Sequence, residues 1–418
     1  MDAFQGMQLN FDVLVVVMGH LWGADDVSRV MRTCRTLYSA GVPKLLCNEV
    51  DICGLRTLMS FYRFISGSEG TRYQHMRELK LSLSIYRVEE RWKSALVEIL
   101  THAQALRKLD IQTTELLDDP RFPVAIFRLP NLTELFMSSK EPEMASVPML
   151  SLMDSKVVKV GLDFICEWED AVEALSNFSS SLEELTLGWA EFISEDIPYV
   201  KMKHLAVELW PVSEIAPLIQ AYPNLRTLVI HGYEDLEREE DIREVNKSFQ
   251  TQRNWKSLDS VSSGIFELYA MAISCKIRYL DVGYLQGPNE AEMLCDILPS
   301  CRPSILQVLF HHTFDIDQFP HIARTIPKEL THFVLSVDLL SKTPEGTTRV
   351  IDLLLDSLPS LSLTKLELML FWHDSGYRCR SCYSDGNGDC EVCHNKRLAP
   401  LPMELFISAF DTYALAHR

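Results

Sequence analysis

The sequence predicts an α/β fold in which short strands and helices alternate to build a solenoid, an irregular horseshoe, behind a small N-terminal module of three helices. Three observations predict it. A short apolar pattern recurs at near-regular intervals. The stretches that follow it often have helical periodicity, and so do the residues before its first occurrence. With 47% apolar and 23% charged residues, the chain has enough apolar material for a large core.

The N-terminal module is predicted over residues 1–42. Asp25 or Asp26 provides an N-cap for its second, short helix, and residues 33–37 form a third helical segment. Residues 43–75 are predicted to connect the module to the first repeat. In the first helix, four apolar residues at the spacing i, i+3, i+4 and i+7 form one face: Leu14, Val17, Met18 and Leu21.

The repeats are predicted over residues 76–371 by the pattern apolar-x-x-apolar-x-apolar, which occurs about twelve times. The spacing from one repeat to the next is 20 to 33 residues, and most spacings lie near the roughly 20–29 residues of leucine-rich repeats. The first positions of the repeats are Met76, Leu106, Leu132, Val157, Leu182, Met202, Leu225, Trp255, Ile277, Leu306, Leu330 and Leu363.

Each repeat is predicted to contain a strand with one buried face, followed by a helix that a proline ends. The motifs Leu129-Pro130-Asn131-Leu132 and Tyr222-Pro223-Asn224-Leu225 show such a stop directly before the next strand. The residue between the two buried positions of a strand faces the concave side, where repeat proteins bind partners.

Aromatic and histidine side chains on this concave side, or just beyond the strands, are candidates for binding hot spots. For any single one of them, core packing or plain surface exposure is the alternative interpretation. The candidate partner-binding residues are Phe136, Trp189, Trp210, Phe310, His311 and Trp372.

The N-terminal residue order, from Leu9-Asn10-Phe11-Asp12-Val13-Leu14 to Cys34-Arg35-x-Leu37, resembles an F-box of about 40 residues. Together with the irregular repeats it makes the chain similar to fungal-type F-box proteins with leucine-rich repeats. The resemblance implies a substrate-recognition adaptor of a cullin-based (SCF-type) ubiquitin ligase, although the family usually has proline where this chain has Asn10. By the same resemblance, the residues that contact the small ligase adaptor are Leu9, Asn10, Val13, Leu14, Val17, Met18 and Leu21.

Two alternatives to this function remain. The N-terminal helices can serve only as a cap for the exposed core of the first repeat, which would make the chain a scaffold or receptor-like binding protein without a ligase partner. A hidden enzyme is the other alternative, because catalytic groups can come together from distant positions. No catalytic or nucleotide-binding motif is found in the sequence, so we expect a non-catalytic binding subunit.

Four cysteines cluster in a loop predicted over residues 372–396, ahead of a C-terminal capping segment at residues 397–418. They form two C-x-x-C pairs, which can hold one structural zinc ion. Free or redox-active thiols are the alternative, and His394 can replace one of the four ligands. The candidate ligands are Cys379, Cys382, Cys390 and Cys393.

Composition narrows the partners further. A net charge of −18 argues against nucleic acid, which requires a basic surface. No apolar run approaches the roughly 20 residues of a membrane span, and the N-terminus lacks the pattern of a secretory signal. Seven further cysteines lie scattered in apolar context and are predicted to be buried, reduced thiols. We therefore expect a cytoplasmic or nuclear protein with a protein partner.

Overall fold

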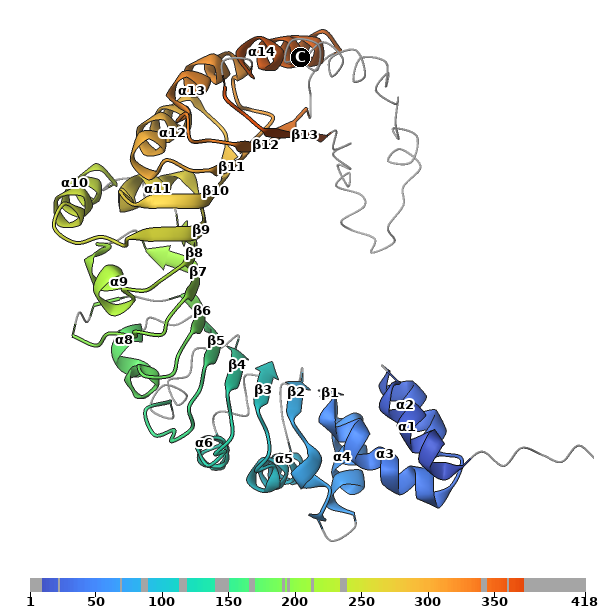
Figure 1. Cartoon of the computed structure of the whole chain (residues 1–418). Helices are drawn as coiled ribbons and strands as arrows, with labels where there is room; N and C mark the ends of the chain where they lie inside the picture. Colours follow the sequence, from blue (N-terminus) through green and yellow to red (C-terminus); the bar gives the residue numbers. More distant parts are fainter. Residues whose placement is uncertain are drawn as a thin grey trace, which may run out of the picture. The chain divides into compact units, whose positions relative to one another are not determined.

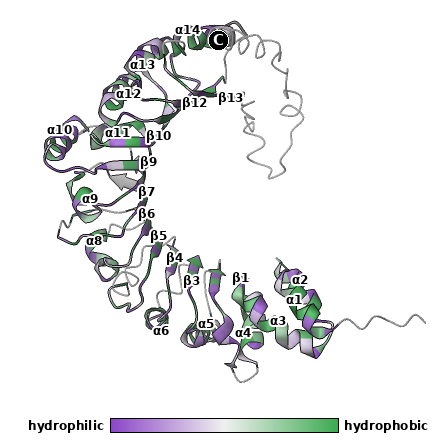
Figure 2. Ribbon diagram, in the orientation of Figure 1, coloured by the Kyte–Doolittle hydropathy of each residue, from purple (hydrophilic) through white to green (hydrophobic). Residues whose placement is uncertain are grey.

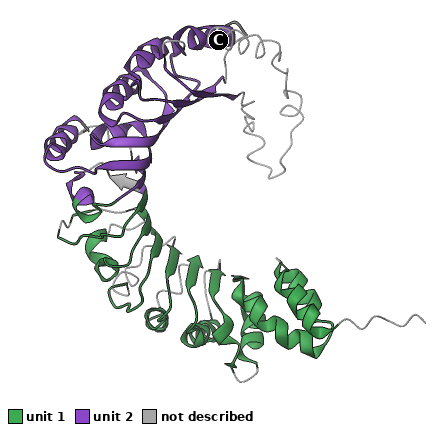
Figure 3. Ribbon diagram, viewed as in Figure 1, with its two compact units in different colours: residues 1–207, 220–224 green, residues 208–219, 225–418 purple. Residues whose placement is uncertain are grey.

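The computed structural model confirms an α/β protein and describes residues 10–371 with several gaps. The described residues are 10–21, 23–67, 70–83, 89–112, 119–139, 150–164, 170–189, 192–193, 196–211, 214–233, 239–339, 344–358 and 361–371. They fall into two compact units (Figure 3). Unit 1 comprises residues 1–207 and 220–224, and unit 2 comprises residues 208–219 and 225–418. The zinc ligands proposed above and residues 372–418 as a whole lie outside the described residues.

Unit 1 begins with three helices in the predicted order, α1 (Phe11–Gly19), α2 (Ala24–Met31) and α3 (Arg35–Cys47). The third is longer than residues 33–37 suggested. It approaches its neighbours closely at Gly41, where a Cβ atom would lie 2.2 Å from Met31 Cγ and 3.1 Å from Met18 Sδ. A glycine is unfavourable inside a helix, so its place here is explained by the close packing of α3 against α1 and α2.

The strands of unit 1 are parallel and pair in chain order from β1 to β6. Helices cover one face of these strands, and no described helix covers the other face (Figure 1). The strands are β1 (Glu49–Cys53), β2 (Glu78–Ser82), β3 (Lys108–Gln112), β4 (Glu134–Ser139), β5 (Lys159–Phe164), β6 (Glu184–Trp189) and β7 (His204–Pro211), the last of which continues into unit 2. The helical segments are α4 (Leu55–Ser66), η2 (Tyr73–His75), α5 (Glu90–His102), α6 (Arg121–Phe127), α8 (Ala171–Ala174) and η3 (Ser176–Phe178).

The predicted connector at residues 43–75 therefore contains a strand and a helix of its own, β1 and α4. Strand β1 pairs with β2 in the register Ile52↔Leu81, and Ile52 is fully buried. The alternation of strand and helix thus begins one period earlier than the sequence pattern indicates.

Unit 2 has the same layering: its strands β8 to β13 are parallel and pair in chain order, with helices on one face (Figure 1). The strands are β8 (Thr227–Tyr233), β9 (Ser257–Ser263), β10 (Lys276–Leu285), β11 (Ile305–Phe310), β12 (His332–Asp338) and β13 (Lys365–Phe371). The helical segments are α10 (Glu239–Gln250), α11 (Ile265–Met271), α12 (Pro288–Cys301), η4 (Ile316–Gln318), α13 (Phe319–Thr325) and α14 (Pro344–Ser357), while α9 (Ala216–Ala221) lies at the boundary of the two units in the sequence.

Several strands are linked at their start to the preceding strand, because a backbone carbonyl just before the preceding strand accepts two hydrogen bonds from the N–H groups at that start. Arg107 O accepts hydrogen bonds from the N–H groups of Thr133 (2.8 Å) and Glu134 (2.9 Å). In unit 2, Thr331 O accepts in the same way from Thr364 (2.8 Å) and Lys365 (3.0 Å). The asparagines of the two Pro-Asn-Leu motifs add a parallel link, because their side-chain amides donate to a carbonyl of the preceding period: Asn131 to Gln104 O and Asn224 to Val200 O, both at 2.8 Å.

The predicted repeat positions are buried at all three sites in nine of the repeats and are half-buried in the last, Leu363-x-x-Leu366-x-Leu368. Two repeats are shifted. In β9, Leu228 of the preceding strand pairs with Val261, so the buried trio is Leu258, Val261 and Ser263 rather than the one starting at Trp255. The sequence pattern does not detect this trio, because its third position is the polar residue Ser263.

The second shifted repeat is in β11, where Leu306, Val308 and Phe310 are buried. The sequence pattern predicts Leu309 in the core and Phe310 on the concave face. The strand sequence Ile-Leu-Gln-Val-Leu-Phe carries apolar residues on both of its faces, so alternation alone does not select the buried one. The prediction that Phe310 faces a partner is therefore wrong.

The free cysteines among the described residues agree only in part with the prediction. Cys275, Cys295 and Cys301 are buried, and burial raises the pKa of Cys275 to about 11 and that of Cys301 to about 12. Cys47 and Cys53 are exposed instead. No described helix combines the length and the apolar character that crossing a bilayer requires.

The polar side chains of α10 hold the C-terminal end of α11, where backbone carbonyls lack partners within their own helix. Asn246 is fully buried, donates to Ala270 O at 2.9 Å and accepts from the N–H of Ile215 at 2.8 Å. Gln250 donates to Met271 O at 2.8 Å. Buried polar groups of this kind stabilise a fold only while all partners remain.

We predict that Asn246→Ala lowers the free energy of unfolding by about 2–4 kcal/mol, because it leaves one buried carbonyl and one buried N–H without a partner. Urea unfolding followed by circular dichroism measures the loss. The control is Asn254→Ala, since Asn254 is exposed and its one side-chain hydrogen bond to a described residue is the 3.4 Å contact with Ser274. Equal losses in the two variants would contradict the role given to the α10 side chains.

Candidate functional site

Helix α1 exposes apolar side chains along much of its length, and it is coloured as a mostly hydrophobic helix in Figure 2. The exposed valines Val13 (48% exposed), Val16 (61%) and Val17 (49%) lie on one side of the helix and are named here the α1 apolar face, while Phe11 (49%) is exposed at its N-terminal end on another side. Met18 is the buried residue of this helix. A helix that is apolar all round is normally covered on all sides. Only one side of α1 is covered by the described residues.

The residues expected to contact the ligase adaptor differ in their exposure to solvent. Val13 and Val17 are exposed, and Leu14 and Leu21 are half-buried. Met18 is 1% exposed and packs inside the module, so it does not reach a partner in this conformation. Leu9 lies outside the described residues. Val16 was missed, although four apolar residues, Val15 to Met18, follow Leu14 directly and cannot all lie on one side of a helix. Phe11 was missed as well.

Asn10 has a structural role beside any role in binding. It is the N-cap of α1, and its side-chain oxygen accepts a hydrogen bond of 3.1 Å from the N–H of Asp12. Side-chain N-caps stabilise helices by about 1 kcal/mol. A substitution at Asn10 therefore changes the helix as well as the surface, and it is a poor test of binding alone.

The uncovered face of the unit 1 strands shows the predicted central row of side chains. The register Lys80↔Asp110↔Phe136↔Gly161↔Thr186 places these residues side by side. The Phe136 ring lies over Gly161, where a Cβ atom would be only 2.5 Å from Phe136 Cδ1. The missing side chain at Gly161 thus leaves room for a half-buried aromatic ring on an otherwise polar row. Partial burial also raises the pKa of Asp110, although the positive charge of Lys80 lowers it in part.

At the start of the same strands the charges compensate one another. Lys108 lies 2.8 Å from Glu49, and Lys159 lies 2.9 Å from Glu184. Such partly exposed pairs contribute little to stability. Because these pairs neutralise each other, neither positive nor negative charge dominates at this edge of the face.

The corresponding row in unit 2 is polar at its centre, with the register Ser262↔Asp281↔Gln307. Asp281 accepts from the Ser262 hydroxyl at 3.3 Å and from the Gln307 amide at 3.4 Å. Tyr279 donates to Gln307 at 2.8 Å. Gln307 therefore takes the open-face position that the sequence pattern assigned to Phe310.

Three other predicted partner-binding residues remain untested. Trp189 and Trp210 lie at or near the ends of β6 and β7, but their side chains are not among those described, and Trp372 lies outside the described residues.

No known protein family matches this sequence, and no curated protein is similar to it. The function therefore has to be argued from the surfaces above, which are an apolar helix face and two uncovered strand faces.

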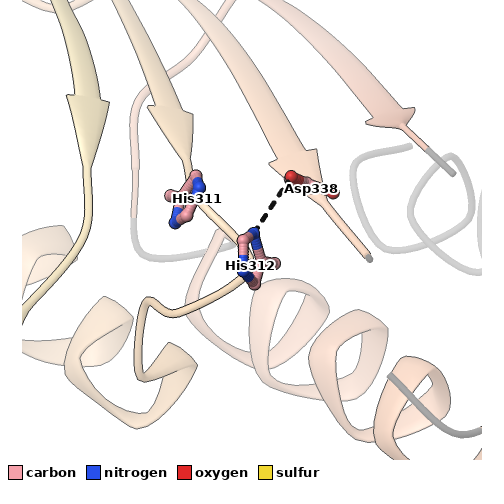
Figure 4. A group of neighbouring side chains, drawn as sticks. All are labelled: His311, His312 and Asp338. Atoms are coloured by element: carbon pink, nitrogen blue, oxygen red, sulfur yellow. Dashed lines mark ion pairs between the residues drawn. The ribbon is translucent and has the colours of Figure 1, made fainter. Parts of the chain in front are cut away.

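One further cluster lies at the carboxyl ends of two neighbouring strands of unit 2. His311 and His312 follow β11 directly, and Asp338 is the last residue of β12. Figure 4 shows His312 facing Asp338, with His312 Nδ1 3.5 Å from Asp338 Oδ2. The centroids of the two imidazole rings are 3.9 Å apart. Among the described residues these three side chains form a group that could hold a metal ion.

Proposed function

We propose that this protein is a non-catalytic substrate-recognition subunit of a cullin-based ubiquitin ligase. In this proposal residues 1–42 are an F-box-like module that docks to the small ligase adaptor. The strand–helix periods form an irregular leucine-rich-repeat solenoid, and its uncovered face binds a target protein. A subunit of this kind is expected in the cytoplasm or the nucleus.

The single observation that carries the proposal is the α1 apolar face. Of the 13 large apolar residues that are exposed among the described residues, four belong to this one helix of nine residues. Exposed apolar residues that are gathered in one place are typical of protein interaction sites. Val13 and Val17 also stand at positions where the F-box resemblance puts adaptor contacts, and Val16 lies beside them.

The uncovered strand faces support the second half of the proposal. The row around Phe136 offers an aromatic ring among polar neighbours, and the row around Gln307 offers hydrogen-bonding groups. Interfaces of regulatory complexes combine such aromatic anchors with polar contacts. The net charge of −18 favours a neutral or basic target.

A binding scaffold without a ligase partner is the second candidate, and one observation favours it. The carbonyl of Leu46 in α3 accepts the N–H of Arg77 at 3.3 Å, at the start of the same series of links that joins the later strands. The N-terminal helices therefore continue into the first strands in the way a cap does.

To test the proposal, the small ligase adaptor, alone or with a cullin, is immobilised on a surface. The affinity of the full chain for it is then measured in a surface binding assay. We predict that Val16→Asp weakens adaptor binding at least about tenfold, because burying one valine contributes about 1.5–3 kcal/mol and about 1.4 kcal/mol corresponds to a factor of ten. The melting temperature should change little, since Val16 is 61% exposed.

The matched control is Val245→Asp, the same substitution at a 47% exposed valine of helix α10. It should leave adaptor binding unchanged. A folded wild-type chain that captures no adaptor would reject the ligase function and favour the scaffold. Equal weakening by both substitutions would show that α1 is not the docking site.

A further inference from the structure

The cluster of His311, His312 and Asp338 is not used by the proposed function. Its position follows from the sheet: β11 and β12 are parallel neighbours with the register Phe310↔Val337, so the next residue of each strand lies at the same edge. His311 N also donates to Leu285 O at 3.0 Å, which fixes the backbone at the end of β11. Two imidazoles from the turn that directly follows β11 and a carboxylate from the last residue of β12 are thus brought together.

The separations suit a shared cation. One ligand atom from each of the three residues lies within 4.8 Å of the others. Zinc–ligand bonds of about 2.0–2.1 Å in tetrahedral geometry place two ligand atoms about 3.4 Å apart. The distance between His312 Nδ1 and Asp338 Oδ2 is 3.5 Å.

His312 Nδ1 is the second observation that points to a ligand. The atom is buried, and its 3.5 Å contact with Asp338 Oδ2 is not a hydrogen bond, so no described residue satisfies it by hydrogen bonding. Buried polar atoms without a partner are rare, and each one calls for an explanation such as an ion. A metal ion between this nitrogen and Asp338 satisfies it.

His311 is oriented by a neighbour. Thr313 Oγ1 lies 2.9 Å from His311 Nδ1 and 3.1 Å from Gln286 O. The threonine hydroxyl donates to Gln286 O, and the Thr313 backbone N–H lies 3.4 Å from the same His311 Nδ1. Thr313 therefore holds the Nδ1 side of the ring, and in the tautomer in which Nδ1–H donates to the threonine hydroxyl, Nε2 has the lone pair that a metal ion needs.

We propose that His311, His312 and Asp338 bind one divalent ion of the zinc type. Two neutral imidazoles and one carboxylate are ligands that zinc, cobalt(II) and nickel(II) accept, whereas calcium and magnesium prefer oxygen ligands. Three protein ligands leave the fourth position of a tetrahedral ion open to water or to a group of a bound partner. None of its three ligands belongs to the four-cysteine motif at residues 379–393.

The test uses Co²⁺ as the probe and the full chain in which Cys379, Cys382, Cys390 and Cys393 are replaced by serine. We expect one Co²⁺ to bind per chain, with visible absorption and without the charge-transfer band of a cobalt thiolate. His312→Ala and Asp338→Ala should each weaken Co²⁺ binding by at least about tenfold. The control is His332→Ala, because His332 contacts Glu367 at 3.1 Å but lies in no three-ligand group among the described residues.

A second measurement avoids dependence on the folding of the serine variant. In the otherwise unsubstituted chain, His312→Ala should lower the number of bound Co²⁺ ions by one and leave any thiolate band unchanged. Absence of stoichiometric Co²⁺ binding in the unsubstituted chain would overturn the site. Binding that is unaffected by both His312→Ala and Asp338→Ala would also overturn it.

Discussion

Phe310→Ala is expected to lower the free energy of unfolding of unit 2 by about 3–5 kcal/mol, the usual cost of removing a buried phenylalanine ring. The ring is 1% exposed and stacks on Phe314 with 4.3 Å between ring centroids. It also meets Phe319 edge-on at 5.8 Å, and Phe319 in turn stacks on Phe333. Its removal therefore opens a cavity beside two aromatic rings, and the packing of Phe319 on Phe333 opposes closure of that cavity. Urea unfolding monitored by circular dichroism gives the value.

The neighbouring residue provides the control. Leu309 lies on the opposite face of the same strand and is only half-buried. Leu309→Ala should therefore cost about 1 kcal/mol or less. The sequence pattern alone predicts the reverse order, with Leu309 in the core and Phe310 outside. A larger loss for Leu309→Ala than for Phe310→Ala would show that the register of β11 is the one predicted from the pattern.

Met18→Asp is expected to unfold the three N-terminal helices. Met18 is 1% exposed, and its sulfur lies close to the point where α3 passes α1 at Gly41. An aspartate there would have to bury a carboxylate, which costs several kcal/mol unless it is paired. Hydrogen–deuterium exchange should show fast exchange throughout α2 and α3, while the amides of β9 to β12 stay protected.

Val17→Asp, one position earlier, is the control for this prediction. Val17 is 49% exposed, so its replacement should leave the protection of α2 and α3 nearly unchanged. Protection that survives Met18→Asp, or that is lost equally in both variants, would contradict the packing of the module described above.

The sequence was sufficient to predict the α/β class, the approximate position of most strands and which face of most strands is buried. It succeeded where a strand alternates cleanly, as in Leu79-Lys80-Leu81, because a period of two leaves one possible core face. It failed in β11, where both faces are apolar, and in β9, where Ser263 occupies a core position. It also missed β1, whose buried residue Ile52 stands in a strand with few apolar neighbours.

The candidate sites were harder to predict for a related reason. The periodicity of α1 puts Met18 and Val17 on the same predicted apolar face, although Met18 is buried and Val17 is exposed. Periodicity alone could not distinguish them, because the burial of residues at i, i+3 and i+4 depends on where the partner helix packs. The proximity of Asp338 to His312 was not predicted either. The two residues are 26 positions apart, and only the parallel register of β11 and β12 brings them together.

The carbonyl links between successive strands have a consequence for how such a chain can change its length in evolution. Arg77 O receives the N–H groups of Arg107 and Lys108, and Arg107 O receives those of Thr133 and Glu134. Loss of residues 107–132 would present Thr133 and Glu134 to Arg77 O, so the same junction would form again. Gain or loss of a whole period is therefore neutral for the backbone, whereas one residue inserted within a strand moves every later side chain of that strand to the other face.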